Sequence, residues 1–337
     1  MNWRPPDKVL LTGGHEVGGL QVFAEAMREG FADLGILGQI VRPHALAGRW
    51  SELRSRRVLK ILSTEAILLA PLARRSICVA HSTLSARDRG WANSLAKLLS
   101  YRLANWRSSA QLIAVSDYVA QHLNDVFDVR VDGVIRDPID NFFLETCSDT
   151  PEQRSYITFI GRLVRCKNVH KLLPAICSLL DEYPNLRCCI VGDGPERSVL
   201  EKTFLDYSRI EFTGTRERDF VRKQLRRSRI FVSGAANEGF GITYLEALSQ
   251  GCSVVMPASG GGLEIALKHI GSGIYLMPIS LERGAVLSAL RTALHSNPVP
   301  FPLQEHTPTA VASAYLQLDR SFSAGTILSA EAAKAQS

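Results

Sequence analysis

Residues 237 to 251 read Asn-Glu-Gly-Phe-Gly-Ile-Thr-Tyr-Leu-Glu-Ala-Leu-Ser-Gln-Gly, and they follow closely on an apolar run from Ile230 to Val232. Such a run is typical of a buried strand, Gly-Phe-Gly is typical of a turn, and the residues after it have a helical pattern. Gly251 is suited to the left-handed stop of that helix. One carboxylate, Glu238, precedes the turn, and a second, Glu246, lies within the helix. This order of strand, turn and helix predicts part of a βαβ unit.

Short apolar runs alternate with longer amphipathic stretches along the whole chain. This alternation predicts an α/β protein with parallel sheets. The chain has 337 residues, more than one core usually organises, so we expect two domains. The predicted strands are residues 9–11, 38–41, 76–80 and 111–115 in the first half and 156–160, 186–191, 210–212, 230–232 and 253–256 in the second.

The break between the two sets of strands lies in a polar stretch from Thr146 to Arg154, which has turn chemistry but no periodic pattern. We therefore predict an N-terminal domain over residues 1–148 and a C-terminal domain over residues 149–322. The remaining residues, 323–337, are rich in Ala and Ser and are predicted to form a tail.

The composition excludes several classes of protein. Hydrophobic residues make up 46% of the chain and charged residues 21%, as in globular proteins and unlike disordered or membrane-embedded ones. The net charge of +6 favours anionic partners, but no nucleic-acid-binding motif accompanies it. The seven cysteines are odd in number and form no CxxC pair, so we expect neither a disulfide framework nor a zinc site. The first residues lack a signal peptide's apolar core, and we expect a cytoplasmic protein.

Open parallel sheets bind ligands beyond the carboxyl ends of their strands, and four loops of this chain follow predicted strands. The first, Thr12 to Gly19, and the third, Val191 to Pro195, are rich in glycine, which suits a phosphate or base site but also a plain tight turn. The second contains Arg162 and Lys167, which suit a diphosphate, although solvated surface charge explains them as well. The fourth is the stretch that begins at residue 237.

Together these motifs resemble the family-4, or group 1, retaining glycosyltransferases of GT-B fold. The resemblance is strongest from Ile157 to Pro278, and it implies two Rossmann-like domains that face each other across a cleft. The motifs that carry it are Gly161-Arg162-Leu163 with Lys167, Val191-Gly192-Asp193-Gly194-Pro195, Phe212-Thr213-Gly214, Glu238 to Glu246, and Gly260-Gly261 with Glu264-Ile265. In the N-terminal half it rests on Gly18-Gly19, His81 and Val115-Ser116.

The resemblance also implies roles for single residues. It assigns the diphosphate to Arg162 and Lys167, the hydroxyls of the transferred sugar to Glu238 and the ribose to Glu246. His81 would contact the sugar near the reacting carbon. The other residues implied to bind the nucleotide-sugar donor are Gly18, Gly19, Gly192, Gly194, Thr213, Phe240, Gly241 and Ile242.

The chain contains no Asp-x-Asp triplet, so we expect neither a metal nor another cofactor. Arg162, Lys167 and the helix start would then neutralise the leaving phosphate. Family members are thought to retain configuration by front-face attack, with the departing phosphate deprotonating the acceptor, so Glu238 would position the sugar. Two residues depart from the family pattern: Asp137 replaces the Asn of an Asn-Gly or Asn-Pro turn, and Asn168 stands where glycine is common.

The function implied is transfer of a hexose-type sugar from a UDP or GDP sugar to a saccharide or lipid-linked acceptor, in bacterial surface polysaccharide, lipopolysaccharide or glycolipid biosynthesis. A nucleotide-sugar epimerase of the same fold and a non-catalytic glycosyltransferase-like subunit stay open as alternatives. Two basic and aromatic stretches, Arg49 to Lys60 and Arg87 to Arg107, suit an anionic membrane surface on the inner face of the cytoplasmic membrane. A solvated amphipathic helix explains them equally, and we expect no nucleic-acid partner.

Overall fold

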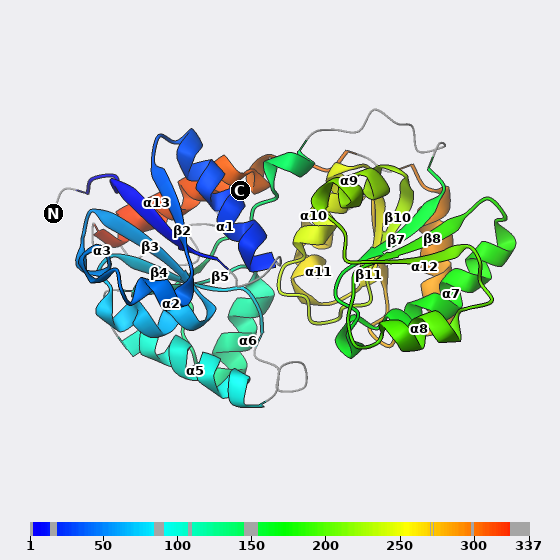
Figure 1. The fold of residues 1–337 in the computed structure, drawn as a ribbon, viewed down its shortest axis with the longest axis horizontal. Coiled ribbons are helices and arrows are strands. Elements are labelled where there is room, and N and C mark those ends of the chain that lie inside the picture. Colours follow the sequence, from blue (N-terminus) through cyan, green and yellow to red (C-terminus); the bar gives the residue numbers. More distant parts are fainter. Residues whose placement is uncertain are drawn as a thin grey trace. The chain divides into compact units, whose positions relative to one another are not determined.

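The computed structural model describes residues 3–13, 19–83, 91–106, 110–144, 154–269, 271, 273–297 and 300–323, and the chain forms two compact units. Unit 1 comprises Met1–Asn141 and Gln304–Ser337, and unit 2 comprises Phe142–Leu303. Each unit contains one parallel sheet with helices packed on it (Figure 1). The predicted α/β class with two parallel-sheet domains is confirmed.

Unit 1 is built on a sheet with the strand order β2-β1-β3-β4-β5-β6. Helix α1 packs on β1 and β2 and against α13, and α5 packs on η1 and β5. The strands are β1 (Lys8–Thr12), β2 (Leu37–Val41), β3 (Val58–Ser63), β4 (Ser76–Ala80), β5 (Ala110–Ala114) and β6 (Gly133–Val134). The helices are α1 (Gly19–Asp33), α2 (Pro43–Leu46), α3 (Trp50–Arg54), α5 (Trp91–Trp106), α6 (Asp117–Phe127) and α13 (Pro308–Ser323), with the 3-10 helices η1 (Thr64–Leu72) and η5 (Gln304–His306).

Unit 2 is built on a sheet with the strand order β12-β11-β10-β7-β8-β9. The chain enters it through the 3-10 helix η2 (Asn141–Phe143), and α7 and α12 pack on each other. The strands are β7 (Tyr156–Ile160), β8 (Arg187–Val191), β9 (Ile210–Gly214), β10 (Ser228–Val232), β11 (Ser253–Pro257) and β12 (Ile274–Met277). The helices are α7 (Val169–Glu182), α8 (Arg197–Thr203), α9 (Arg218–Arg226), α10 (Ile242–Ser249), α11 (Gly260–Lys268) and α12 (Arg283–His295), with the 3-10 helix η4 (Arg165–Lys167).

The central strand β3 was not among the predicted strands. It is buried along its whole length, but it contains Lys60 and follows a run of arginines, so it does not read as an apolar run. The ammonium group of Lys60 donates to the carbonyl oxygens of Ser55, at 2.6 Å, and Arg74. Residues 58–60 of the stretch interpreted as membrane-binding therefore lie in the core of unit 1, not on its surface.

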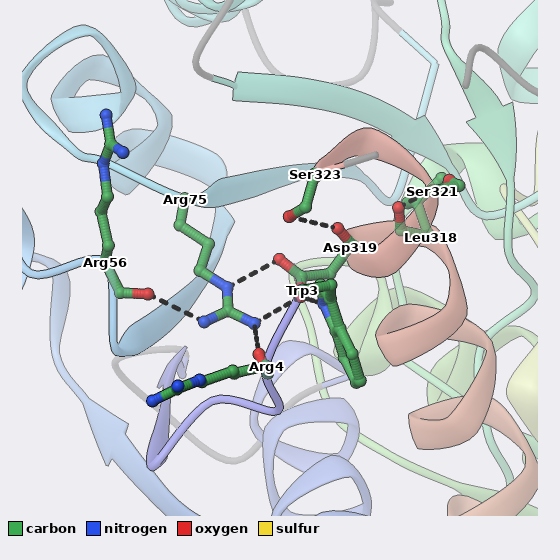
Figure 2. A network of polar contacts seen from close by, with 8 residues as sticks. All are labelled: Trp3, Arg4, Arg56, Arg75, Leu318, Asp319, Ser321 and Ser323. Atoms are coloured by element: carbon green, nitrogen blue, oxygen red, sulfur yellow. Dashed lines mark hydrogen bonds and ion pairs between the residues drawn. The ribbon is translucent and has the colours of Figure 1, made fainter. Parts of the chain in front are cut away.

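Helix α13 belongs to unit 1, not to the C-terminal domain in which the sequence placed it. A Cβ atom at Gly30 of α1 would lie 2.1 Å from the carbonyl oxygen of Pro308, so this glycine permits the close packing of α1 and α13. The carboxylate of Asp319 accepts hydrogen bonds from Nε (2.9 Å) and Nη2 (2.7 Å) of Arg75 and from Nε1 of Trp3 (2.7 Å), as Figure 2 shows. Such contacts join distant parts of the chain, which no local pattern reveals.

Candidate functional site

The loops singled out by the sequence lie at one edge of the sheet in unit 2. Strands β10, β7 and β8 are neighbours and run parallel, so the loops that follow them meet at their carboxyl ends. The loop after β7 contains Arg162 and Lys167, and the loop after β10 contains Glu238.

An ion pair joins these two loops. The ammonium nitrogen of Lys167 donates to Oε2 of Glu238 at 2.5 Å. The two side chains are 28% and 27% exposed, so both charged groups are accessible to a ligand with anionic and hydroxyl groups. Arg162 lies exposed in the same loop as Lys167 and adds positive charge there.

Backbone contacts fix the loop that carries Lys167. Asn168 has a left-handed backbone with φ of 53°, and its side-chain nitrogen Nδ2 donates to the carbonyl oxygen of Gly234 at 2.9 Å. Asn adopts this conformation more readily than other residues with a side chain, so it is compatible with a position where glycine is common. A Cβ atom at Gly234 would lie 2.8 Å from the carbonyl oxygen of Lys167, so the two loops lie in direct contact.

The glycines at the start of α11 hold the backbone of Glu238. The amide nitrogen of Gly261 donates to the carbonyl oxygen of Glu238 at 2.9 Å. A Cβ atom at Gly261 would lie 2.1 Å from the carbonyl oxygen of Gly239, and one at Gly260 would lie 2.7 Å from that of Glu238. No side chain fits at these contacts, which explains the paired glycines.

Helix α10 begins directly beside the ion pair. Its first residue follows Gly241, which has φ of 97°, and a Cβ atom there would lie 2.4 Å from the ring of Tyr244. Burial first, and the charge of Glu238 second, raise the pKa of Tyr244 well above its ordinary value. The loop that contains Glu238 leads directly into this helix, and no side chain caps its start, so the positive end of the helix dipole lies at the end of that loop.

The remaining predicted donor residues of unit 2 are placed as follows. Phe240 is buried, Ile242 is partly exposed, and Glu246 is buried within α10. A Cβ atom at Gly192 would lie 1.9 Å from the carbonyl oxygen of Gly161. A Cβ atom at Gly194 would lie 2.3 Å from the carbonyl oxygen of Leu163. Oγ1 of Thr213 donates to the carbonyl oxygen of Gly214 at 3.1 Å. Close packing of the loops after β7 and β8 therefore accounts for the glycines between them.

In unit 1, His81 follows β4 and contacts side chains from two other strand ends. Its Nδ1 lies 3.2 Å from Oδ2 of Asp137, and its Nε2 lies 3.2 Å from Oγ of Ser63. Neither partner was predicted as a site residue, although polar residues at or shortly after strand ends were a signal for them. Gly19 is exposed at the start of α1, and Gly18 lies outside the described residues.

Among the residues that the structure describes, no group of three or more His, Cys, Asp or Glu side chains is placed to hold a metal ion. Burial raises the pKa of Cys189 to about 12 and that of Cys188 well above its ordinary value. Both thiols are therefore held in the neutral form, which is a poor metal ligand.

Residues 145–294, nearly the whole of unit 2, match the family model "Glycosyl transferases group 1". Unit 2 is a group 1 glycosyltransferase domain. This domain shares 32% identity over 150 residues with the sulfoquinovosyl transferase SQD2 of Arabidopsis thaliana, which is 44% of this chain and 28% of that protein. The lipopolysaccharide core biosynthesis glycosyltransferase LpsE of Rhizobium meliloti is 27% identical over 235 residues, a match that covers 64% of this chain and 66% of LpsE.

Solved glycosyltransferase structures match both units. Anabaena HepE in complex with UDP and glucose has a TM-score of 0.66 and 19% identity, with 96% of this chain and 99% of that chain covered. WaaG, a glycosyltransferase involved in lipopolysaccharide biosynthesis, has a TM-score of 0.65 and 15% identity, with 95% and 98% covered. These matches establish the GT-B fold for the chain. By sequence, the chain spans 24% to 33% of the length of the first three curated relatives.

Proposed function

We propose that this chain is a retaining, metal-independent glycosyltransferase that moves a hexose-type sugar from a UDP or GDP sugar to a saccharide or lipid-linked acceptor. The observation that carries the proposal is the exposed ion pair of Lys167 and Glu238 beside the start of α10. A group 1 domain, the GT-B fold, and similarity to a sulfoquinovosyl transferase and to a lipopolysaccharide core biosynthesis glycosyltransferase support it.

The charges at this edge suit the departure of a nucleoside diphosphate. A diphosphate carries more negative charge than one carboxylate, so Lys167 can exchange Glu238 for phosphate oxygens as the donor binds. Glu238 is then available to the hydroxyls of the sugar. Arg162, Lys167 and the N–H groups at the start of α10 would stabilise the charge that grows on the leaving phosphate.

The front-face mechanism requires no carboxylate nucleophile. The departing phosphate oxygen takes the proton of the acceptor hydroxyl while that hydroxyl oxygen attacks the anomeric carbon on the same face. Glu238 therefore acts as a positioning group for the sugar. Two measurements test these details: NMR of the product gives its anomeric configuration, and activity in excess chelator should equal that without it. An inverted product or loss of activity in chelator would contradict the corresponding part.

Substitution of the ion pair tests the proposal directly. We expect Glu238→Ala and Lys167→Ala each to lower turnover by about a hundredfold, the typical loss when one transition-state electrostatic contact is removed. Lys202→Ala, which removes an exposed lysine on α8, is the matched control and should leave turnover unchanged. Wild-type rates in both site variants would refute the proposal, and conversion of donor alone into an epimer would favour an epimerase.

The nucleotide is identified by thermal unfolding with UDP, GDP and ADP. A ligand at a hundred times its Kd stabilises the folded protein by about 2.7 kcal/mol, so the preferred nucleotide should raise Tm most. We expect UDP or GDP to give the largest shift. Equal shifts for all three, or the largest with ADP, would refute the proposed donor class.

We also propose that unit 1 binds the anionic inner face of the cytoplasmic membrane. In the described part of the chain, no helix is long and apolar enough to cross a bilayer. Leu95 and Leu99 are one turn apart on α5 and are 48% and 52% exposed, and Leu68 and Leu72 of the adjoining η1 are 47% and 40% exposed. Arg102 is exposed on the same helix, and apolar side chains beside a cation suit an anionic lipid surface.

Vesicle flotation tests the membrane proposal. The chain should float with vesicles that contain anionic lipid, and the double variant Leu95→Ser/Leu99→Ser should float several-fold less. Leu205→Ser is the control: it removes a leucine of unit 2 that is 79% exposed, and this variant should bind the vesicles as the unchanged protein does. Absence of binding to anionic vesicles, or equal binding of both variants, would refute this surface.

A further inference from the structure

Three polar side chains in unit 1 form a hydrogen-bonded row. Ser63 ends β3, His81 follows β4, and Asp137 lies three residues beyond β6. Oγ of Ser63 lies 3.2 Å from Nε2 of His81, and Oδ2 of Asp137 lies 3.2 Å from Nδ1. The ring of Phe23 packs edge-on against the imidazole with a centroid distance of 4.6 Å. The imidazole is therefore held on both nitrogens and on one face.

The order serine, histidine and aspartate is that of a hydrolase triad, but burial excludes that chemistry here. Ser63 is only 1% exposed, so its oxygen is out of reach of an attacked carbonyl. His81 is the most accessible of the three, with 14% of its side chain exposed against 6% for Asp137. The row therefore presents the histidine, and the other two side chains act on it.

The backbone on both sides of Asp137 is fixed. The amide nitrogen of Ile135 donates to the carbonyl oxygen of Ala114 at 3.0 Å, and that of Ile139 donates to the carbonyl oxygen of His306 at 2.8 Å. Oδ1 of Asp137 is buried and has no hydrogen-bond partner among the residues that the structure describes, where the carboxylate's hydrogen bond is the one between Oδ2 and His81. Asp137 is also one of the two residues that depart from the family pattern, and this departure places a negative charge next to His81.

We propose that Asp137 is a positioning residue that keeps the proton of the neutral His81 imidazole on Nδ1 and leaves Nε2 as an acceptor. A carboxylate can only accept, so Nδ1 must donate to it, and the hydroxyl of Ser63 then donates to Nε2. The inference rests on the proposed function, together with the contact between His81 and the transferred sugar that the family resemblance implies. A sugar hydroxyl would then replace the Ser63 hydroxyl as the donor to Nε2.

Nitrogen NMR of the imidazole tests the assignment without any turnover. In the full-length chain labelled with ¹⁵N-histidine, and assigned with His81→Gln, the His81 ring should show a protonated Nδ1 and an unprotonated Nε2 at pH 8. A proton on Nε2 in the unchanged protein would overturn the proposal, whether or not any variant folds. This result stands apart from the proposed function, which turnover and donor binding test separately.

Asp137→Asn then tests the consequence for the reaction. Its amide can donate to Nδ1, which would move the imidazole proton to Nε2 and remove the acceptor. We expect kcat to fall about tenfold to a hundredfold, the loss associated with one charge-assisted hydrogen bond, while the donor KM changes less than threefold. Asp125→Asn on the exposed face of α6 is the charge-matched control and should change neither. A shifted proton with unchanged kcat, or an unshifted proton, would overturn the proposal.

Discussion

The contact between α11 and the loop of Glu238 makes Gly261→Ala a demanding test of the site geometry. The added Cβ would lie 2.1 Å from the carbonyl oxygen and 2.8 Å from the carbonyl carbon of Gly239, and 2.8 Å from Cα of Phe240. All three atoms belong to the backbone, so no side chain can turn away, and the loop must move by about 1 Å to reach ordinary contact. Inserting a methyl group into a packed region costs about 1–3 kcal/mol.

That cost predicts a fall in Tm of about 3–10 °C for a unit of this size. Because Gly261 also donates to the carbonyl oxygen of Glu238, donor binding should weaken in the same variant. Gly284→Ala in α12 is the matched control: no atom lies within 4 Å of the added Cβ, so its better helix propensity should stabilise unit 2 by about 0.5–1 kcal/mol. Thermal unfolding with and without nucleotide measures both effects. If Gly261→Ala matched the unchanged protein in Tm and in nucleotide shift, the geometry described for this loop would be wrong.

Three further predictions concern unit 1. Burial lowers the pKa of Lys60 from 10.5 to about 7. Between these two pH values the unfolded chain binds one proton more than the folded chain. The free energy of unfolding, relative to that of Lys60→Met, should therefore rise by about 1.4 kcal/mol per pH unit from pH 7 to 10. Urea unfolding at several pH values measures this rise, and parallel profiles would contradict it. Asp319→Ala leaves the side chain of Arg75, which is only 15% exposed, without its carboxylate partner. It should destabilise unit 1 by about 3 kcal/mol, measured by chemical unfolding. A loss of stability below about 1 kcal/mol would count against the network in Figure 2. Ser116→Ala removes the hydroxyl that caps α6 by accepting from the backbone amide of Val119 at 3.1 Å, and it should lower the free energy of unfolding by about 1 kcal/mol in the same assay. The control Ser51→Ala, at an exposed serine, should lower it by less.

The fold was predictable where a strand is both covered on its two faces and apolar in sequence. All residues of β4, β5, β10 and β11 are buried, and buried parallel strands read as apolar runs. Strand β3 escaped prediction because a buried lysine interrupts its pattern, and the carbonyl oxygens that accept from Lys60 are set by the tertiary fold. The return of α13 to unit 1 escaped for a similar reason, since its contacts lie with residues near the other end of the chain.

The candidate site was predictable to the level of loops. Parallel strands bring the loops after β7 and β10 together, so Lys167 and Glu238 could be grouped before their ion pair was known. Their partners could not be predicted. The role of Gly261 depends on a contact with Gly239, and the contact of Asp137 with His81 depends on the register of β4, β5 and β6.

Glu238 in unit 2 and His81 in unit 1 are held in place in different ways, and this difference predicts how each site responds to substitution. In unit 2 the backbone of Glu238 is fixed by Gly260 and Gly261, so a change there moves the chain and should alter stability and donor binding together. In unit 1 the imidazole of His81 is fixed by the side chains of Ser63 and Asp137. A replacement of equal size at Asp137 alters the position of one proton and leaves the backbone in place. A fall in kcat without a change in Tm is therefore expected from unit 1, whereas the glycine substitutions in unit 2 should lower both Tm and donor affinity.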